Sequence, residues 1–139
     1  EFSGVARYMQ DMKDKVHKDR YVKTIFGRRR QFREINSQII ELVRQAERMA
    51  INMPIQGTAA DLLKLAMIKI SDLIHSENKD KEVRMLLQVH DELVFEVKKE
   101  LAGDWAKKIK EIMENIWKIE VPLTTDVKYG INWSEMKPL

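Results

Sequence analysis

The stretch MLLQVHDELVFEV, residues 85–97, carries two apolar runs separated by three polar residues. The runs 83–89 and 93–97 are typical of strands, and only His90, Asp91 and Glu92 lie between them. So short a connection predicts an antiparallel β-hairpin. Tight hairpin ends usually carry Asn-Gly or Asp-Gly, which tolerate a positive φ, and this one has no glycine. Turn chemistry therefore does not explain an imidazole and two carboxylates at the tip.

The hairpin tip allows two interpretations. It is either an exposed polar turn, or a site that holds a hard cation such as Mg²⁺ through carboxylate oxygen. Successive strand residues point to opposite faces, so Asp91 is the expected direct ligand and Glu92 need not converge on the same ion. A two-metal phosphoryl-transfer site needs a second converging carboxylate. Asp61 and Asp126 are the candidates within the chain only by default.

The other elements follow from the spacing of apolar residues. Spacings of three and four predict four helices. They cover residues 3–18, residues 36 or 37 to about 46, residues 59–73 and residues 100–119. Pro54 and Gly57 are expected to interrupt or bend the chain between the second and third of these helices. The remaining segments are a short strand at 21–26, a basic connector at 28–33, a polar loop at 75–81 and a last strand at 123–129. Trp105, Trp117 and Trp133 are expected in the core. The predicted fold is α+β, with long helices packed on a small antiparallel sheet that contains the hairpin.

Composition excludes several classes of protein. The chain has 139 residues, 44% of them hydrophobic and 34% charged, which is typical of a globular domain. It has no cysteine, which excludes disulfides, thiolate zinc sites and thiol nucleophiles. No apolar run approaches the roughly 18 residues of a membrane span, so no membrane partner is expected and the expected location is the cytoplasm. Residues 1–48 carry 12 Lys/Arg against 7 Asp/Glu, which favours a polyanionic partner or a solvated basic face.

A second candidate site precedes the hairpin. Arg48, Asn52 and Gln56 are spaced by four and share one face if the helix continues through them. Their side chains are donors that suit the acceptors of the DNA minor groove, whose pattern is degenerate. The alternative is a helical turn that projects into solvent. Residues 28–30 are all arginine and either contact phosphates or form a solvated basic turn.

These residues resemble a known family. AERMAINMPIQGTAAD at 46–61 and QVHDEL at 88–93 resemble the C-terminal palm region of bacterial DNA polymerase I, family A. YVKTIFGRRR at 21–30 and YGINW at 129–133 are similar to the same family. The resemblance covers essentially the whole chain. It implies that residues 1–30 are the end of a fingers-like segment and residues 31–139 the C-terminal part of a palm-like domain.

The resemblance also implies roles for individual residues. Asp91 would be the catalytic carboxylate on Mg²⁺, with Glu92 assisting beside it. The residues implied near primer–template DNA and the incoming nucleotide are Arg48, Asn52 and Gln56, and those implied near the primer terminus are Gln88 and His90.

The chain departs from the family pattern by lacking three of its parts. No segment resembles the upstream strand with the other metal-binding aspartate, and the nucleotide-gripping fingers helix and the thumb are missing. We therefore expect a C-terminal fragment or subunit of a Mg²⁺-dependent DNA polymerase, a nucleotidyltransferase of DNA replication and repair. It would need the remainder of the polypeptide, primer–template DNA and deoxynucleoside triphosphates, and would be nearly inactive alone.

Two other functions are weighed against this one. The first is a non-catalytic module that binds duplex nucleic acid on the same scaffold. The second is a metal phosphohydrolase of the His-Asp type, which is disfavoured because His17, His75 and His90 show no suitable grouping.

Overall fold

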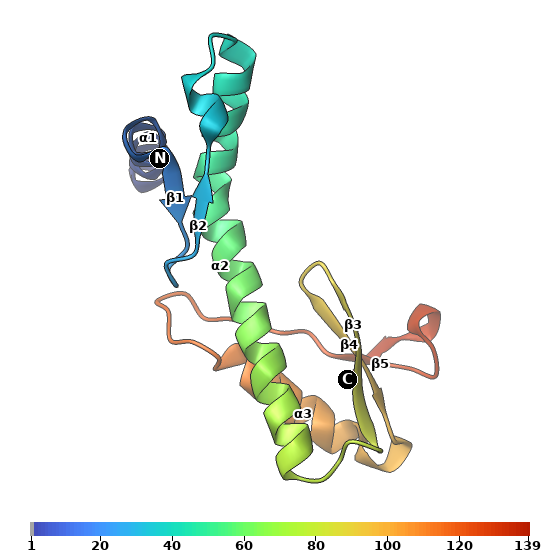
Figure 1. Ribbon diagram of the computed structural model, residues 1–139. Coiled ribbons are helices and arrows are strands. Elements are labelled where there is room, and N and C mark those ends of the chain that lie inside the picture. The colour runs from blue at the N-terminus through green and yellow to red at the C-terminus, as the bar shows by residue number, and fades with distance from the viewer. Residues whose placement is uncertain (1) are drawn as a thin grey trace. The chain divides into compact units, whose positions relative to one another are not determined.

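The computed structural model of the protein describes residues 2–139. In chain order the helices and strands are α1 (Ser3–Asp19), β1 (Tyr21–Lys23), β2 (Arg29–Gln31), α2 (Ile40–Ser76), β3 (Val83–Val89), β4 (Glu92–Val97), α3 (Ala102–Glu114), β5 (Lys128–Tyr129) and β6 (Lys137–Pro138) (Figure 1). Short 3₁₀ helices lie at Arg33–Asn36, Lys99–Leu101 and Trp133–Glu135. The strands pair as three antiparallel two-stranded sheets, β1–β2, β3–β4 and β5–β6, which confirms the predicted α+β class.

The chain divides into two compact units, residues 1–61 and 62–139, and the division falls within α2. Each unit has its own hydrophobic core. The division expected after residue 30 falls inside β2 and remains a prediction about polymerase subdomains.

The core of the first unit is built by α1, β1, the segment from Phe32 through the 3₁₀ helix Arg33–Asn36, and the first part of α2. Its buried members are Val16, Val22, Phe32, Ile35, Ala46, Ala50 and Met53. The helix α1 ends at Arg20, whose positive φ of 61° turns the chain toward β1. Residues 29–31, expected in a basic connector, form β2 instead, with Val22 opposite Arg30. Pairing with β1, whose central residue Val22 is buried, makes this arginine-rich segment a strand, although its own sequence has no strand pattern.

The helix α2 is continuous over 37 residues and includes Pro54. The expected interruption at Pro54 and Gly57 is therefore wrong. A proline inside a helix removes one N–H donor and crowds the preceding turn. Ala46, Ala50 and Met53 are buried in the core on one face of this part of α2, and this tertiary packing stabilises the helix through the proline.

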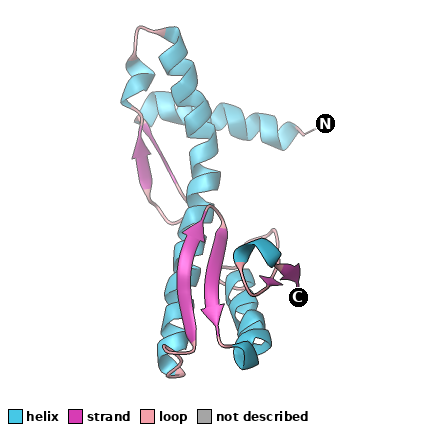
Figure 2. Ribbon diagram, turned by 90° about the vertical axis from the view of Figure 1, so that its right-hand side faces the viewer, coloured by secondary structure: helices cyan, strands magenta, loops and turns pink. Residues whose placement is uncertain are grey.

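In the second unit the β3–β4 hairpin and α3 pack beside the last part of α2 (Figures 1 and 2). The buried residues Ile70 and Ile74 of α2, Val83 of β3, and Trp105 and Ile109 of α3 form the core. Their spacing of four places each helical pair on one helix face. The predicted hairpin is confirmed, with β4 beginning one residue earlier than expected.

The end of the chain differs from the prediction. The helix α3 ends at Glu114, and Asn115 caps it, since its main-chain N–H and its side-chain amide both donate to the Glu111 carbonyl. Of the expected last strand, only Lys128–Tyr129 pairs.

The three tryptophans do not share one environment. Trp105 is 1% exposed, as predicted, but Trp117 is 48% and Trp133 is 52% exposed, so the core assignment is wrong for these two. Among the described residues, no helix combines the length and apolar character that a membrane span requires.

Candidate functional site

The tip of the β3–β4 hairpin consists of His90 and Asp91 alone. The strands pair from Val83 opposite Val97 at the base to Val89 opposite Glu92 at the tip. Favoured two-residue connections need a positive φ, and His90 supplies it with 54°. Left-handed backbone costs a residue other than glycine roughly 1–2 kcal/mol. The tip is therefore a strained turn, and strain of this kind is common at functional sites.

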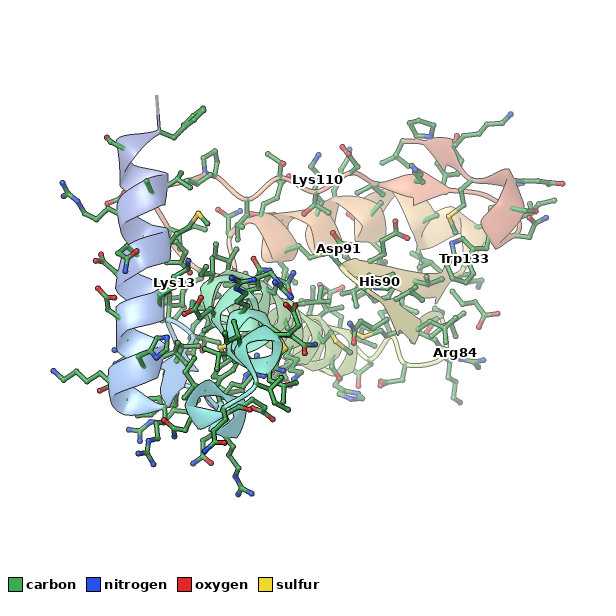
Figure 3. The ribbon with its side chains drawn as sticks, turned by 90° about the horizontal axis from the view of Figure 1, so that it is seen from above. Lys13, Arg84, His90, Asp91, Lys110 and Trp133 are labelled. Atoms are coloured by element: carbon green, nitrogen blue, oxygen red, sulfur yellow. The ribbon has the colours of Figure 1, made fainter. Side chains whose placement is uncertain are left out.

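A side-chain hydrogen bond closes this turn. Gln88 Nε2 donates to the backbone carbonyl of His90 at 2.8 Å. Gln88, His90, Asp91 and Glu92 are all exposed, and Figure 3 shows His90 and Asp91 among the surrounding side chains. The structure thus brings four of the predicted site residues together at one hairpin end.

A β-bulge separates the anchored base of the hairpin from its tip. The register steps from Met85 opposite Phe95 to Leu87 opposite Val94, which leaves Leu86 as the extra residue. A bulge bends its strand and changes the direction of the side chains beyond it. The base is held by Phe95 and its neighbours on the core, whereas Leu86 and Leu87 are 52% and 50% exposed. The tip therefore projects from a packed base.

The tip supplies oxygen ligands but does not complete a metal site. Asp91 and Glu92 offer carboxylate oxygens, the ligands that Mg²⁺ prefers. Residues 2–139 contain no group of three or more His, Cys, Asp or Glu side chains that could hold a metal ion. The donor chemistry fits Mg²⁺, and the described residues provide only part of a coordination sphere.

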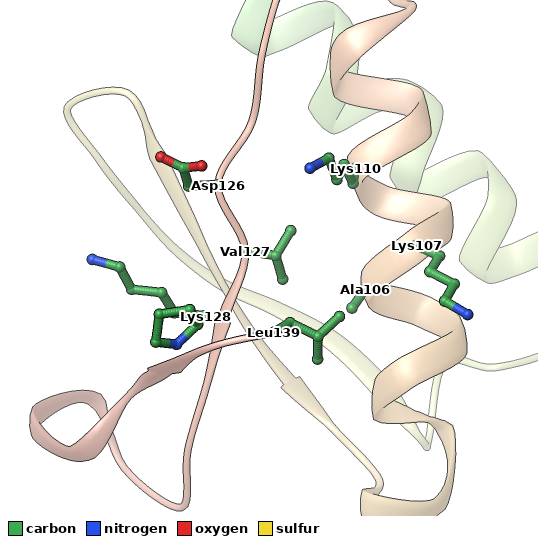
Figure 4. A pocket seen from close by; sticks show the side chains of 8 residues that line it. Ala106, Lys107, Lys110, Asp126, Val127, Lys128 and Leu139 are labelled. Carbon is green, nitrogen blue, oxygen red and sulfur yellow. The ribbon is translucent and has the colours of Figure 1, made fainter.

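Asp61 and Asp126, the candidates for a second metal-binding carboxylate, both have cationic neighbours. Asp61 Oδ1 accepts a 2.7 Å hydrogen bond from Arg28 Nε. Asp126 lines a hollow of about 380 Å³ together with three lysines, and no residue of the hairpin tip lines it (Figure 4). Positive charges this close do not favour binding of a further cation.

The second predicted group lies on α2, in the first unit. Arg48, Asn52 and Gln56 are all exposed, and their spacing of four places them in one row. Arg48 Nη2 is 3.2 Å from Glu41 Oε1, and the two side chains are 62% and 70% exposed. So exposed an ion pair contributes little stability, and the guanidinium remains available to a ligand.

Arg28 has a structural role that the sequence reasoning missed. Its Nη2 donates to the Gly57 carbonyl at 2.9 Å, in addition to the bond from Nε to Asp61. A Cβ at Gly57 would lie 2.7 Å from Cγ2 of the buried Thr24. Gly57 therefore admits the β1–β2 hairpin close to α2. The signal that could have found this contact is a glycine inside an otherwise helical stretch.

Comparison with known proteins identifies the family. Residues 1–135 match the family described as DNA polymerase family A. The chain is 47% identical over 117 residues to the thermostable DNA polymerase I of Thermus thermophilus, which covers 84% of the chain and 14% of that protein. It is 41% identical over 136 residues to DNA polymerase I of Streptococcus pneumoniae, which covers 98% of the chain and 15% of that protein.

A solved structure gives the same result. The POL domain of Pol1 from M. smegmatis, in complex with DNA primer-template and dNTP, superposes with a TM-score of 0.81 at 43% identity. The match covers 88% of this chain and 21% of that one. The chain spans about one seventh of the length of the two curated relatives above. It belongs to DNA polymerase family A.

Proposed function

We propose that the chain is the C-terminal part of the palm of a template-directed DNA polymerase, with the end of the fingers in residues 1–30. The reaction joins the primer 3′-oxygen to the α-phosphorus of a deoxynucleoside triphosphate, and pyrophosphate leaves. Membership of family A over residues 1–135 supports this proposal. The single observation that carries it is the exposed and strained tip His90–Asp91, followed by the exposed Glu92, on a hairpin whose base packs on the core.

Asp91 is the proposed ligand of Mg²⁺, with Glu92 assisting beside it. Bound Mg²⁺ supplies charge stabilisation at the phosphoryl oxygens. The chain itself holds the carboxylate in place, because packing of the hairpin base and the bond from Gln88 to His90 limit movement of the tip. Gln88 and His90 are proposed to lie at the primer terminus.

The exposed row on α2 is proposed to contact the primer–template. Arg48, Asn52 and Gln56 present donors, and every base pair offers acceptors in the minor groove. Donors placed against this degenerate pattern hold a duplex without selecting its sequence, as a template-directed enzyme requires. The M. smegmatis relative, whose structure contains primer-template and dNTP, supports these partners.

The proposed active site is incomplete without further polypeptide. Two-metal phosphoryl transfer needs carboxylates that converge from both sides, and the described residues contain no group of three or more potential ligands. We therefore expect the 139-residue chain to be nearly inactive alone and to depend on an upstream palm aspartate and a nucleotide-binding fingers helix.

Reconstitution tests this proposal. The chain is mixed with the upstream polypeptide of a family A relative, and extension of a labelled primer is measured with and without Mg²⁺. Extension is expected only in the mixture with Mg²⁺, and Asp91→Ala should reduce it to background. Glu96→Ala removes an exposed carboxylate from the same hairpin and should leave extension unchanged.

Two results would contradict the proposal. Full extension by the mixture with Asp91→Ala would remove Asp91 from the catalytic site. Salt-sensitive duplex binding by the isolated chain, with no extension in any mixture, would favour the non-catalytic binding module instead.

A further inference from the structure

The exposed row on α2 spans a proline. Arg48 and Asn52 precede Pro54, and Gln56 follows it. A proline has no N–H to donate to the carbonyl four residues earlier, here that of Ala50, and it is one of the few causes of a sharp bend in a helix. A bend at this point would turn the two parts of the row away from each other. An aligned row therefore depends on what fixes α2 on both sides of the proline.

A side chain of α1 fixes the part of α2 that precedes the proline. The hydroxyl of Tyr8 donates a 2.8 Å hydrogen bond to the main-chain carbonyl of Ile51, three residues before Pro54. The bond is partly buried and joins residues 43 positions apart in the chain. Val16 of the same helix is fully buried in the core of the first unit. The core thus anchors the helix that carries this donor.

The turn between β1 and β2 fixes the part of α2 that follows the proline. Arg28 Nη2 donates to the main-chain carbonyl of Gly57 at 2.9 Å, and Arg28 Nε donates to Asp61 Oδ1 at 2.7 Å. The main-chain N–H of Ile25 donates to Thr58 Oγ1 at 3.3 Å. The guanidinium binds two acceptors one helical turn apart, and its planar fork fixes the direction of that turn.

Two external donors therefore bind carbonyls on either side of Pro54, at Ile51 three residues before it and at Gly57 three residues after it. Both acceptors are main-chain oxygens, so neither bond uses a side chain of the row. We propose that Tyr8 and Arg28 are positioning residues that hold α2 across the proline and so keep the row aligned for its ligand. Neither residue touches that ligand itself. The inference rests on the proposed function, which gives the row primer–template as its ligand.

Distance measurements test the alignment without any ligand. The chain has no cysteine, so Arg44→Cys with Ala60→Cys introduces two unique spin-label sites at exposed positions of α2. The two sites are about 24 Å apart along the helix, with the proline between them. Double electron–electron resonance should give a narrow distance distribution, and Tyr8→Phe with Arg28→Lys should broaden or shift it. Adding Pro54→Ala should restore the narrow distribution, because the helix regains its N–H.

Kinetics test the effect on the row. In the mixture with the upstream polypeptide of a family A relative, Tyr8→Phe and Arg28→Lys should each raise the KM for primer–template about fivefold, the factor for one net hydrogen bond. The kcat should not change. Arg28→Lys keeps the positive charge and removes the fork that binds two acceptors. In a Pro54→Ala background the same two changes should leave KM unchanged. A purely structural role would instead lower the active fraction, and with it kcat, at unchanged KM.

Tyr129→Phe is the matched control. It removes a hydroxyl from an exposed tyrosine outside α2 and should change neither the distance distribution nor KM. Far-UV circular dichroism checks that each variant keeps its helices.

Three results would overturn the inference. These are an unchanged distance distribution after Tyr8→Phe with Arg28→Lys, an unchanged KM in both single variants, or a KM increase that persists in the Pro54→Ala background. No extension by the wild-type mixture would instead contradict the proposed function. The distance measurement needs no extension, so the failure of one proposal is distinguishable from the failure of the other.

Discussion

The phenolic hydroxyl of Tyr8 donates a 2.8 Å hydrogen bond to the backbone carbonyl of Ile51, and so joins α1 to α2. Ile51 lies three residues before Pro54, where the proline ring crowds the helix and weakens its internal hydrogen bonds. The hydroxyl therefore supplies an external donor to the turn of α2 that precedes Pro54. The same turn carries Asn52, a proposed contact to DNA.

Tyr8→Phe removes this donor and keeps the ring. We expect the free energy of unfolding to fall by about 1 kcal/mol, the net contribution of one hydrogen bond. Urea denaturation followed by circular dichroism measures it. Tyr129→Phe removes a hydroxyl from an exposed tyrosine and should change stability by less than about 0.5 kcal/mol. Equal effects of the two variants would mean that the bond to Ile51 contributes nothing.

The stability that Tyr8 contributes is expected to depend on pH. Burial raises the pKa of Tyr8 above its ordinary value of 10.0. The folded state thus holds the phenol proton more tightly than the unfolded state, and this contribution is present below pH 10 and is lost as pH rises through the raised pKa. The stability difference between wild type and Tyr8→Phe should shrink when denaturation is repeated above pH 10. A constant difference would contradict this.

Gly57→Ala should destabilise the first unit despite the better helix propensity of alanine. The new Cβ would lie 2.7 Å from Cγ2 of Thr24, which is buried and cannot move away freely. Overpacking costs about 1–3 kcal/mol, whereas alanine gains roughly 0.8–1.0 kcal/mol in a helix. Thr24→Ser removes the methyl group and keeps the oxygen that accepts from the Arg28 N–H. In that background Gly57→Ala should be neutral or stabilising, and thermal melts of the four proteins test this.

Arg28 and Arg29 are adjacent in the chain, but replacing them is expected to change stability by different amounts. Arg28→Gln breaks the bonds to Asp61 and Gly57 and should lower stability by about 1–3 kcal/mol. Arg29→Gln removes a cation that has a like-charged partner and no acidic one among the described residues, so its stability should change by less than about 0.5 kcal/mol. Similar stability losses in both variants would contradict this division of roles.

Trp105→Ala and Trp133→Ala test the core of the second unit. Trp105 is buried beside Ile70 and Val83, and its loss should cost about 3–5 kcal/mol. Trp133 is half exposed, and its loss should cost far less. Denaturant unfolding monitored by far-UV circular dichroism compares them, since fluorescence would itself change on removal of a tryptophan.

Much of the second unit was predictable because its elements are encoded locally. The alternation of apolar residues over 83–97 places both strands correctly, and the lack of glycine at the tip already indicated an unusual turn. The structure adds the positive φ of His90 and the bond from Gln88, neither of which a periodic pattern contains. The roles of Asp91, Glu92 and the row on α2 remain predictions supported by membership of the family.

The sequence by itself determined the hairpin, the first helix and the α+β class, since these depend on the order of polar and apolar residues a few positions apart. Only the tertiary structure decided that α2 continues through Pro54, that Arg29 lies in a strand, and that Trp133 is exposed. The first two depend on contacts with residues distant in the chain. The net free energy of such contacts exceeds the local preference of any single proline or arginine, and only the folded chain brings their partners together.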